Sequence, residues 1–390
     1  MFGPWSGAPL IQNEPMRVLH VITALGVGGA EHMLLKLLGS PALADIDQQV
    51  VALLPGGAMA APMRAAGARV HELDFLGGVP VLGGSVQLAR LARRFDPQLV
   101  HGWLYHGNLG AALARKALRH RVPLVWGVRQ SLPSLAGENA FARVAIRLNK
   151  TLSAHPDCLL FNSRTGQEHH RAFGFDTRRA RYLPNGFETD RFVPNPADRA
   201  RLRAAWGVDD AAVVFGLLAR HHPVKDHAGF LQAARLVGEQ RPQAHFVLAG
   251  TGVDSSNEAL LRQVADSGLG ARLHLLGERH DVPAVLSALD ACVSASRAEA
   301  FSNTVGEAMA CALPCVVTAV GDSADIVSDT GLVVPAGQPE ALAAAMLQLV
   351  DLGATGRAAW GARARARIQS DFSLDAVAAR HASLYRELVA

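Results

Sequence analysis

The chain has 390 residues, of which 49% are hydrophobic and 18% are charged. This composition is typical of a folded globular protein and excludes bulk disorder, and the length exceeds what one hydrophobic core usually spans, so we expect two domains. The formal net charge of +4 comes from arginines spread along the chain, which does not indicate nucleic-acid binding but suits a partner that carries phosphates.

The cysteines and the N-terminal segment indicate the compartment. The four cysteines lack the close paired spacing of a zinc site or a disulfide framework, so we expect a reducing environment. Residues 1–15 have neither the basic nor the continuous apolar stretch of a secretory signal, and we expect them to be flexible. No apolar stretch reaches the roughly 18 residues that a membrane-spanning helix needs. These features predict a cytoplasmic protein.

Residues 16–195 alternate between short apolar runs and segments with helical spacing. Apolar runs separated by crossover helices are typical of a parallel sheet that is covered on both faces, so we expect a doubly wound, Rossmann-like α/β domain. The expected strands lie at residues 17–25, 48–54, 68–74, 99–103, 123–128 and 158–163.

The alternation breaks at "VPNPADR", where Pro194 and Pro196 mark a candidate hinge. It then restarts and predicts a second domain of the same kind over residues 196–372, whereas residues 373–390 are expected to form a helix that packs back on the first domain. The strands expected in the second domain lie at residues 212–219, 245–250, 272–277, 291–296 and 314–319. Two such domains facing each other create a cleft at the carboxyl ends of their strands, where open α/β sheets bind ligands.

Two glycine turns follow expected strands. Gly28 and Gly29 precede a helix, so they either let backbone amides approach an anion or form a tight turn without a ligand. Gly250 and Gly252, in "LAGTG", end a strand of the second domain and offer backbone the same close approach to a ligand.

Two cations, Arg220 and Lys225, follow the first strand of the second domain. A pair of cations at the carboxyl end of a strand either clamps a diphosphate through charge-assisted hydrogen bonds or forms a solvated surface pair.

The stretch "EAFSNTVGE" holds two acids, Glu299 and Glu307. Glu299 falls in a loop, whereas Glu307 falls in the first turns of a helix that Ser302 or Asn303 caps. The free amides at the start of that helix lie between the acids, so the element offers acceptors for sugar hydroxyls on both sides of an anion site. The alternatives are a surface loop charge for Glu299 and a helix-dipole or capping role for Glu307.

Taken in order, these motifs resemble the motif set of the family-4 retaining glycosyltransferases of the GT-B fold. They are "GVGGAE", "LPNGFETDRF", "LLARHHPVKDH", "LAGTG" and "SRAEAFSNTVGEAMACALPCVVTAVGDSADIV", and the resemblance extends over nearly the whole chain. It implies two Rossmann-like doubly wound domains facing across a cleft, with the acceptor site mainly in the first domain and the nucleotide-sugar donor site mainly in the second.

The resemblance also implies roles for residues of this chain. Arg220 and Lys225 would hold the donor diphosphate and stabilise the departing charge, Glu299 would contact the donor sugar, and Glu307 would hold the ribose hydroxyls. The further residues expected on the donor side are Phe301, Ser302, Asn303, Gly250 and Gly252. The residues expected on the acceptor side are Gly28, Gly29, His106 and Arg129.

At one position the chain departs from the family pattern. After the strand at residues 123–128 many members have a histidine that touches the donor sugar, and here this position is Arg129. Together with "WLYHGNL" at residues 103–109, this resembles the subgroup that extends bacterial surface polysaccharides, often on polyprenyl-diphosphate-linked acceptors. Arg129 either meets an acceptor phosphate or pairs with a carboxylate, and His106 either contacts the acceptor or makes a structural hydrogen bond.

The activity implied is the transfer of a hexose from a nucleotide diphosphate sugar, with uridine as the expected base, to a hydroxyl of a glycan or of a polyprenyl-diphosphate-linked saccharide. Neither a metal nor another cofactor is expected, and the single Asp-x-Asp match, Asp45 to Asp47, is expected in a solvated loop. The alternatives are a GT-B-fold sugar-nucleotide epimerase and a non-catalytic sugar-nucleotide-binding protein.

Two basic segments, residues 112–121 and 141–150, have apolar residues at helical spacing. This pattern is compatible with peripheral docking on an anionic membrane surface, and ordinary amphipathic helices of a basic protein share it.

Overall fold

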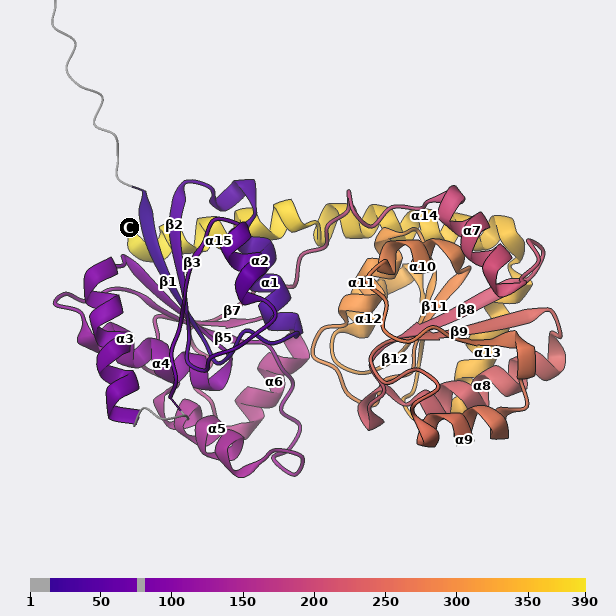
Figure 1. The fold of residues 1–390 in the computed structure, drawn as a ribbon, viewed down its shortest axis with the longest axis horizontal. Coiled ribbons are helices and arrows are strands. Elements are labelled where there is room, and N and C mark those ends of the chain that lie inside the picture. The colour runs from indigo at the N-terminus through magenta and orange to yellow at the C-terminus, as the bar shows by residue number, and fades with distance from the viewer. Residues whose placement is uncertain (1–14, 76–80) are drawn as a thin grey trace, which may run out of the picture.

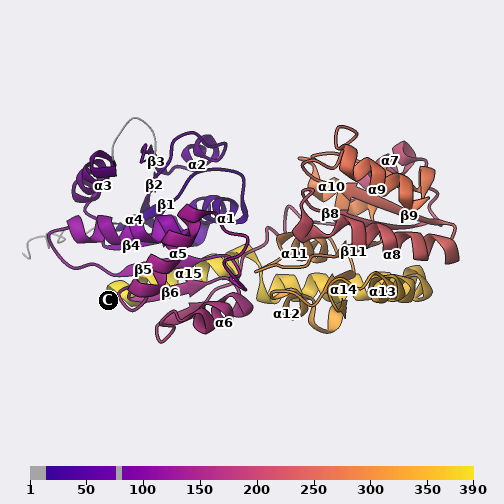
Figure 2. The same cartoon turned by 90° about the horizontal axis from the view of Figure 1, so that it is seen from below.

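A computed structural model of the protein describes residues 15–75 and 81–390 (Figure 1). It shows two lobes side by side, each built on one parallel β-sheet with helices on both faces (Figures 1 and 2). This confirms the predicted α/β class with two doubly wound sheets. Residues 1–14 of the segment that we expected to be flexible lie outside the described residues.

The N-terminal lobe has a seven-stranded sheet in the order β3-β2-β1-β4-β5-β6-β7. Its strands are β1 (Met16–Ile22), β2 (Ile46–Ala52), β3 (Arg69–Glu72), β4 (Leu99–Trp103), β5 (Leu124–Val128), β6 (Cys158–Phe161) and β7 (Ala180–Tyr182). Its helices are α1 (Gly29–Leu38), η1 (Pro41–Leu43), α2 (Ala60–Ala65), α3 (Val81–Phe95), α4 (Leu104–Ala117), α5 (Ala140–Leu152) and α6 (Arg164–Phe173). Successive side chains of β1 face opposite layers, because Val18 packs with α1 and α2 whereas Leu19 packs with α3 and α4.

The C-terminal lobe has a six-stranded sheet in the order β10-β9-β8-β11-β12-β13. Its strands are β8 (Val213–Leu218), β9 (Ala244–Ala249), β10 (Leu273–Leu275), β11 (Ala291–Ser294), β12 (Cys315–Thr318) and β13 (Leu332–Val334). Its helices are α7 (Pro196–Trp206), η2 (Pro223–Lys225), α8 (His227–Gln240), α9 (Glu258–Ser267), η3 (Gly270–Arg272), α10 (Val282–Ala288), α11 (Asn303–Ala310), α12 (Ser323–Val327), η4 (Ser328–Thr330), α13 (Pro339–Asp351) and α14 (Gly353–Asp371). Val214 packs toward α7, α10, α11 and α14, and Phe215 packs toward α8, α9 and α13.

The chain crosses between the lobes earlier than the two prolines suggested. Leu183 packs in the N-terminal core, whereas Phe187 and Phe192 already pack in the C-terminal core. Pro194 and Pro196 therefore do not mark the crossing. Pro196 instead begins α7, whose first amides donate to the Asn195 side chain, because proline is well tolerated at the start of a helix.

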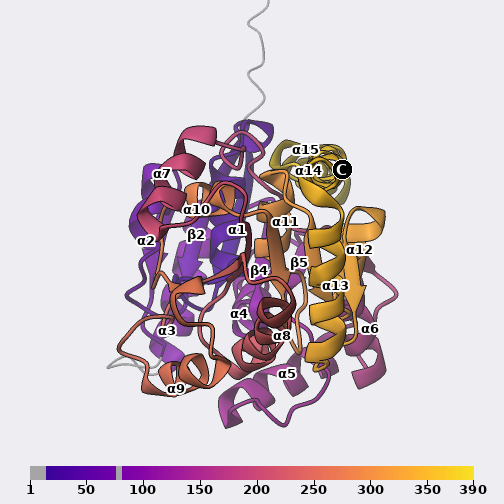
Figure 3. The ribbon, with the colours of Figure 1, turned by 90° about the vertical axis from the view of Figure 1, so that its right-hand side faces the viewer.

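The chain crosses a second time before the last helix, α15 (Leu374–Val389). The two crossings are hydrogen-bonded to each other, since the Phe187 amide donates to the Phe372 carbonyl at 2.9 Å and the Leu374 amide donates to the Phe187 carbonyl at 2.8 Å. Beyond this point α15 packs in the core of the N-terminal lobe through Val377 and Tyr385. Seen along the line that joins the lobes, α14 and α15 lie one behind the other (Figure 3).

The lobes also meet at the start of α6. The buried Asp322 carboxylate, from the C-terminal lobe, accepts hydrogen bonds from Ser163 Oγ at 2.9 Å and from the backbone amides of Arg164 at 2.8 Å and Thr165 at 3.0 Å. One lobe thus satisfies the first amides of a helix in the other.

All eleven expected strands are present, and the structure adds two more. These are the three-residue strands β7 and β13, which lie in segments whose apolar runs are too short to stand out in the sequence. Ile46 begins β2, so Asp47 lies in a strand and our expectation of a loop was wrong for that residue. Asp45 forms an ion pair with Arg386 at 2.8 Å, and Asp47 lies 3.8 Å from an Arg69 guanidinium nitrogen.

The four cysteines are buried free thiols. Within residues 15–75 and 81–390, histidine, cysteine, aspartate and glutamate side chains form no group of three or more that could hold a metal ion. Across the same described ranges no helix combines the length and the apolar character needed to cross a membrane.

Candidate active site

A cavity of about 560 Å³ lies between the two lobes. Its N-terminal wall comes from residues that follow β1, β4, β5, β6 and β7, and its C-terminal wall comes from residues that follow β8 and β11. Loops at the carboxyl ends of parallel strands commonly form ligand sites, so this is the candidate active site. The lining residues used below are Gly29, Glu31, Arg129, Asn162, Asn185, Arg220, Glu299, Phe301 and Asn303.

Lys225 and Glu299, which were expected to act on the donor, meet at the C-terminal wall. Their side chains form an ion pair and are only 26% and 12% exposed, and the Glu299 carboxylate also accepts a hydrogen bond from Ser296 Oγ at 2.8 Å. A space of about 10 Å³ beside the pair reaches Ser302 and Thr304 at the start of α11. That space holds about one water, so a larger ligand has to approach from the main cavity.

Arg220 is exposed on the same wall, on the loop after β8. Glu299 thus shares the main cavity with Arg220 and the small space with Lys225, although it follows β11 whereas both cations follow β8.

Gly250 and Gly252 are not among the described residues that line this cavity. Gly250 has a φ of +147°, and a Cβ there would lie 2.2 Å from the Ala219 carbonyl oxygen. Glycine thus lets the loop after β9 pack against the backbone next to Arg220. Direct contact of these glycines with a ligand stays a prediction.

The start of α11 lies beside Glu299. Ser302 is the N-cap residue, and its side chain accepts no hydrogen bond from the described backbone, so the first helix amides remain available to another acceptor. The Phe301 ring is buried and stacks on Phe187 with 6.0 Å between the ring centroids, which fixes the direction of the loop. Helix amides at an N-terminus attract anions, so this end of α11 suits a phosphate group.

Glu307 lies one turn after Asn303, and the charged groups that act on it belong to Lys36, Arg191 and Glu188. Burial raises the pKa of Glu307 to about 7, and the two cations partly oppose this shift. Among the described residues that line the cavity, Glu307 is not included. Its contact with a ribose stays a prediction.

The glycine loop that was expected on the acceptor side reaches the opposite wall. Gly28 is the N-cap of α1 and Gly29 its first residue, and a Cβ on Gly29 would lie 3.2 Å from Asn303 Nδ2 across the lobes. Glu31, one turn into α1, also lines the cavity, and burial raises its pKa. Glu31 belongs to the "GVGGAE" motif, from which no role was predicted for this residue.

Arg129 is buried on the N-terminal wall, and its Nη2 donates to Asn185 Oδ1 rather than to a carboxylate. His106 is not among the described residues that line the cavity. Burial lowers its pKa, and a hydrogen bond with the Phe141 backbone partly opposes that shift, which favours the structural alternative for His106.

Asn185 joins the two walls, and sequence reasoning gave it no role. Its Oδ1 accepts from Arg129 and from Asn162 Nδ2 at 3.3 Å, while its Nδ2 donates to Asn303 Oδ1 at 2.7 Å. The only feature of the sequence that could have pointed to Asn185 is its place in the "LPNGFETDRF" motif.

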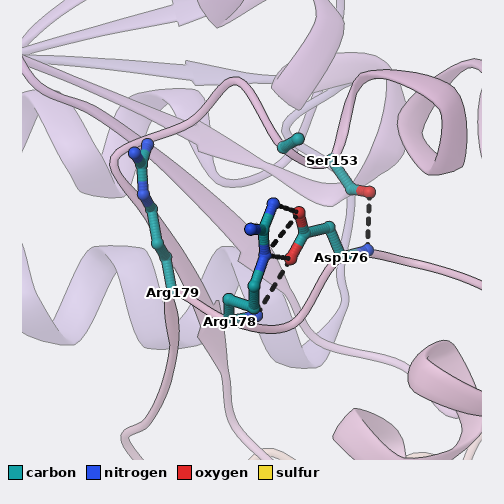
Figure 4. Close-up of a pocket in the computed structure, with 5 residues that line it drawn as sticks. Ser153, Asp176, Arg178 and Arg179 are labelled. Atoms are coloured by element: carbon teal, nitrogen blue, oxygen red, sulfur yellow. Dashed lines mark hydrogen bonds and ion pairs between the residues drawn. The ribbon is translucent and has the colours of Figure 1, made fainter.

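A smaller cavity of about 130 Å³ lies elsewhere on the N-terminal lobe (Figure 4). It is lined by Ser153, Ala154, Asp176, Arg178 and Arg179. Arg178 and Asp176 already pair with each other at 2.5 Å, and none of the lining residues is a predicted site residue. We assign the site to the cavity between the lobes because its lining includes predicted site residues from both walls, among them Arg129, Arg220 and Glu299.

Two parallel α/β lobes with a cleft at the carboxyl ends of their strands define the GT-B class of fold. Solved structures that share this fold include HepE of Anabaena in complex with UDP, with 22% identity and a TM-score of 0.83 over 96% of this chain and 100% of that chain. They also include WaaG, a glycosyltransferase involved in lipopolysaccharide biosynthesis, with 15% identity and a TM-score of 0.72 over 95% of this chain and 99% of that chain.

The sequence then gives the family. The glycosyl transferase 4-like domain model matches residues 28–186, and the glycosyl transferases group 1 model matches residues 212–351. The chain belongs to the group 1 glycosyltransferases of the GT-B fold.

Two curated relatives show the range of the similarity. The lipopolysaccharide core biosynthesis mannosyltransferase LpsB of Rhizobium meliloti is 32% identical over 54% of this chain and 64% of its own length. The UDP-Gal:alpha-D-GlcNAc-diphosphoundecaprenol alpha-1,3-galactosyltransferase of Escherichia coli is 30% identical over 37% of each chain. The chain thus spans less than two thirds of the length of these relatives.

Proposed function

We propose that this protein is a retaining hexosyltransferase that moves a sugar from a uridine diphosphate sugar to a hydroxyl of a glycan or of a polyprenyl-diphosphate-linked saccharide. The observation that carries the proposal is the position of Glu299, which lines the cavity together with Arg220 and the start of α11 and pairs with Lys225 in the small space beside it. Cations and helix amides suit a diphosphate, and a carboxylate suits a sugar hydroxyl.

The relatives favour this choice of substrates. HepE has been solved with UDP and with UDP-glucose, and the Escherichia coli relative is named for UDP-Gal and a diphosphoundecaprenol-linked sugar. A relative from Corynebacterium glutamicum is named as GDP-mannose-dependent, 28% identical over 51% of this chain and 54% of its own length, so a guanosine-linked mannose is the competing donor.

In the proposed reaction the bond between the donor sugar and the diphosphate breaks, and negative charge grows on the leaving diphosphate. Arg220, Lys225 and the first amides of α11 stabilise that charge, so we propose that the reaction needs no metal. The acceptor hydroxyl attacks from the face that the diphosphate leaves, and a phosphate oxygen takes its proton. The configuration is then retained without a separate general base.

We further propose that the enzyme works at the inner face of the cytoplasmic membrane. On α5 the apolar side chains of Phe141, Val144 and Leu148 are 74%, 55% and 46% exposed, and Arg143 and Arg147 are exposed on the same helix. Exposed apolar and basic side chains together suit an anionic lipid surface. Because α5 follows a loop that lines the cavity, docking on it would bring the cavity close to lipid-linked acceptors.

The test is turnover with UDP-hexoses and with GDP-mannose, each with and without a lipid-diphosphate-linked saccharide. We expect transfer only when donor and acceptor are both present, a product with the anomeric configuration of the donor, and unchanged activity after chelation. A donor that changes without an acceptor would indicate an epimerase. Binding of UDP-sugars without any turnover would indicate a non-catalytic protein, and loss of activity on chelation would contradict the metal-free mechanism.

A further inference from the structure

Arg129 is a buried cation on the N-terminal wall of the cavity. It directly follows β5, is 8% exposed and lines the cavity. Its guanidinium carbon lies 5.0 Å from the centroid of the Trp103 ring, a cation–π contact that holds the group against the wall. A cation removed from water in this way needs a negative partner or a full set of acceptors.

The described protein supplies neither. No carboxylate in the described ranges forms an ion pair with Arg129, and its side-chain acceptor is the neutral amide of Asn185. That oxygen is already shared with Asn162. The Nε and Nη1 atoms of Arg129 are buried without a hydrogen-bond partner among the described residues.

The titratable side chains around Arg129 do not offset its charge either. Burial lowers the pKa of His20 to about 4 and that of His381 to about 3, and it lowers the pKa of His101 well below its usual value. Burial raises the pKa of Tyr385. At neutral pH these rings are therefore uncharged, and Arg129 remains an uncompensated positive charge beside the cavity.

We propose that Arg129 is the phosphate-binding group of the acceptor subsite, and this inference rests on the proposed function. The donor diphosphate is assigned to Arg220, Lys225 and α11 on the C-terminal wall, whereas Arg129 lies on the opposite wall of the same cavity. An arginine fork matches phosphate oxygens well, and a phosphate supplies both the negative charge and the acceptors that Arg129 lacks.

The position of Arg129 also restricts which molecules can serve as the acceptor. The hydroxyl that receives the sugar has to lie next to the donor sugar in the cavity, and the phosphate has to reach Arg129 in the same cavity. The two groups must then be close in the covalent structure of the acceptor. A monosaccharide or short saccharide linked to a lipid diphosphate fits this requirement, whereas the growing end of a long neutral glycan does not. The reaction that supplies the substrate is thus the transfer of a sugar phosphate onto a lipid phosphate, followed, for a short saccharide, by the transfer of one further sugar onto a hydroxyl of that first sugar.

Kinetics with two acceptors test the subsite. Arg129→Met keeps an apolar stem on Trp103 and removes the charge, and Arg129→Lys keeps the charge. With a lipid-diphosphate-linked monosaccharide, we expect R129M to raise the acceptor KM by about tenfold or more at a nearly constant donor KM, and R129K to recover part of the loss. With the same saccharide as a phosphate-free alkyl glycoside, wild type and R129M should have equal kcat/KM. Equal losses on both acceptors, or a loss confined to the donor KM, would overturn the inference.

A binding measurement separates this inference from the proposed function. With the donor site saturated by UDP, farnesyl diphosphate is titrated while tryptophan fluorescence is followed, because Arg129 lies on Trp103. We expect a saturable change for wild type that R129M and the phosphate-free probe farnesol do not give. If binding depends on Arg129 but no substrate is turned over, the proposed function is wrong and the phosphate site stands. If turnover is normal and R129M binds farnesyl diphosphate as well as wild type does, the phosphate site is wrong and the proposed function stands.

The fold of the variant is the remaining control. R129M removes an uncompensated buried charge, so we expect it to melt at the wild-type temperature or above it. If R129M does not fold, Arg129→Gln takes its place in the same measurements.

Discussion

Lys225, at the end of η2, and Glu299, in the loop after β11, form an ion pair although they are 74 positions apart in the sequence. Ser296 donates a further hydrogen bond to the same carboxylate, so the pair is fixed in one geometry. Each charge offsets the cost of partly burying the other. A donor that uses both residues has to replace the ion pair by contacts with its own diphosphate and sugar.

Lys225→Ala is expected to lower kcat by about 100-fold or more, because one lost donor to a developing oxyanion costs about 100- to 1000-fold. The ion pair is partly buried and Glu299 keeps its hydrogen bond from Ser296, so we expect the free energy of unfolding to fall by on the order of 1 to 3 kcal/mol. Steady-state kinetics and thermal melting measure the two effects. Arg235→Ala, which removes an exposed cation paired with Glu239, is the control and should change neither. A loss of stability at constant kcat would make Lys225 a surface pairing residue.

Glu299→Gln keeps the size of the side chain and removes its charge. We expect kcat/KM for the UDP-sugar to fall about tenfold or more, because a charged hydrogen bond to the donor sugar is lost. UDP itself should bind as well as before or better, since Lys225 is released to meet the diphosphate. Kinetics and UDP titration measure the two quantities, and Glu138→Gln on the opposite wall is the control for cavity charge. Equal weakening of UDP and of UDP-sugar would contradict the assignment of Glu299 to the sugar.

The raised pKa of Glu307 predicts a pH-dependent stability. Because burial raises this pKa from 4.5 to about 7, the folded protein holds a proton that the unfolded chain releases. The protonation of Glu307 therefore contributes on the order of 1 to 3 kcal/mol to the free energy of unfolding. This contribution is complete below about pH 4.5 and is lost as the pH rises through about 7. Between about pH 5 and pH 8 the melting temperature of wild type should fall relative to that of Glu307→Gln. Parallel curves for the two proteins would show that Glu307 ionises normally.

The exposed face of α5 predicts binding to anionic vesicles. Wild type is expected to float with vesicles rich in anionic lipid at low salt, and Phe141→Ser combined with Leu148→Ser should abolish most of this binding, because both side chains lose their insertion energy. The double variant should keep its turnover on a water-soluble acceptor. Leu352→Ser, an exposed apolar residue of the C-terminal lobe, is the control. Wild type that stays in solution would show that acceptors are met away from the membrane.

The sheets were predictable because their central strands are runs of apolar residues buried on both faces, such as the one around Phe215. The position at which the chain crosses between the lobes was not predictable. Pro194 and Pro196 carry a strong local signal, whereas the crossing depends on which core receives Phe187 and Phe192, and that is a tertiary property.

The site was predictable where topology decides the outcome. Arg220, Lys225 and Glu299 follow strands of one parallel sheet, so their meeting at its edge could be expected. Asn185 could not be found in this way, because its partners lie 23, 56 and 118 positions away and no local pattern reports such a meeting. The choice between a phosphate and a carboxylate for Arg129 stayed open for the same reason.

The backbone hydrogen bonds of Phe187 with Phe372 and Leu374 join the two segments of the chain that cross between the lobes. The two lobes are therefore connected at one place, which acts as a hinge. Any rotation of the lobes that widens the cavity occurs about this hinge, called the pivot below. Because Phe187 also stacks on Phe301, the pivot lies directly against the loop that carries Glu299. The same rotation has to separate Asp322 from the start of α6. Opening the cleft to exchange substrates therefore exposes the first backbone amides of α6, on the N-terminal lobe.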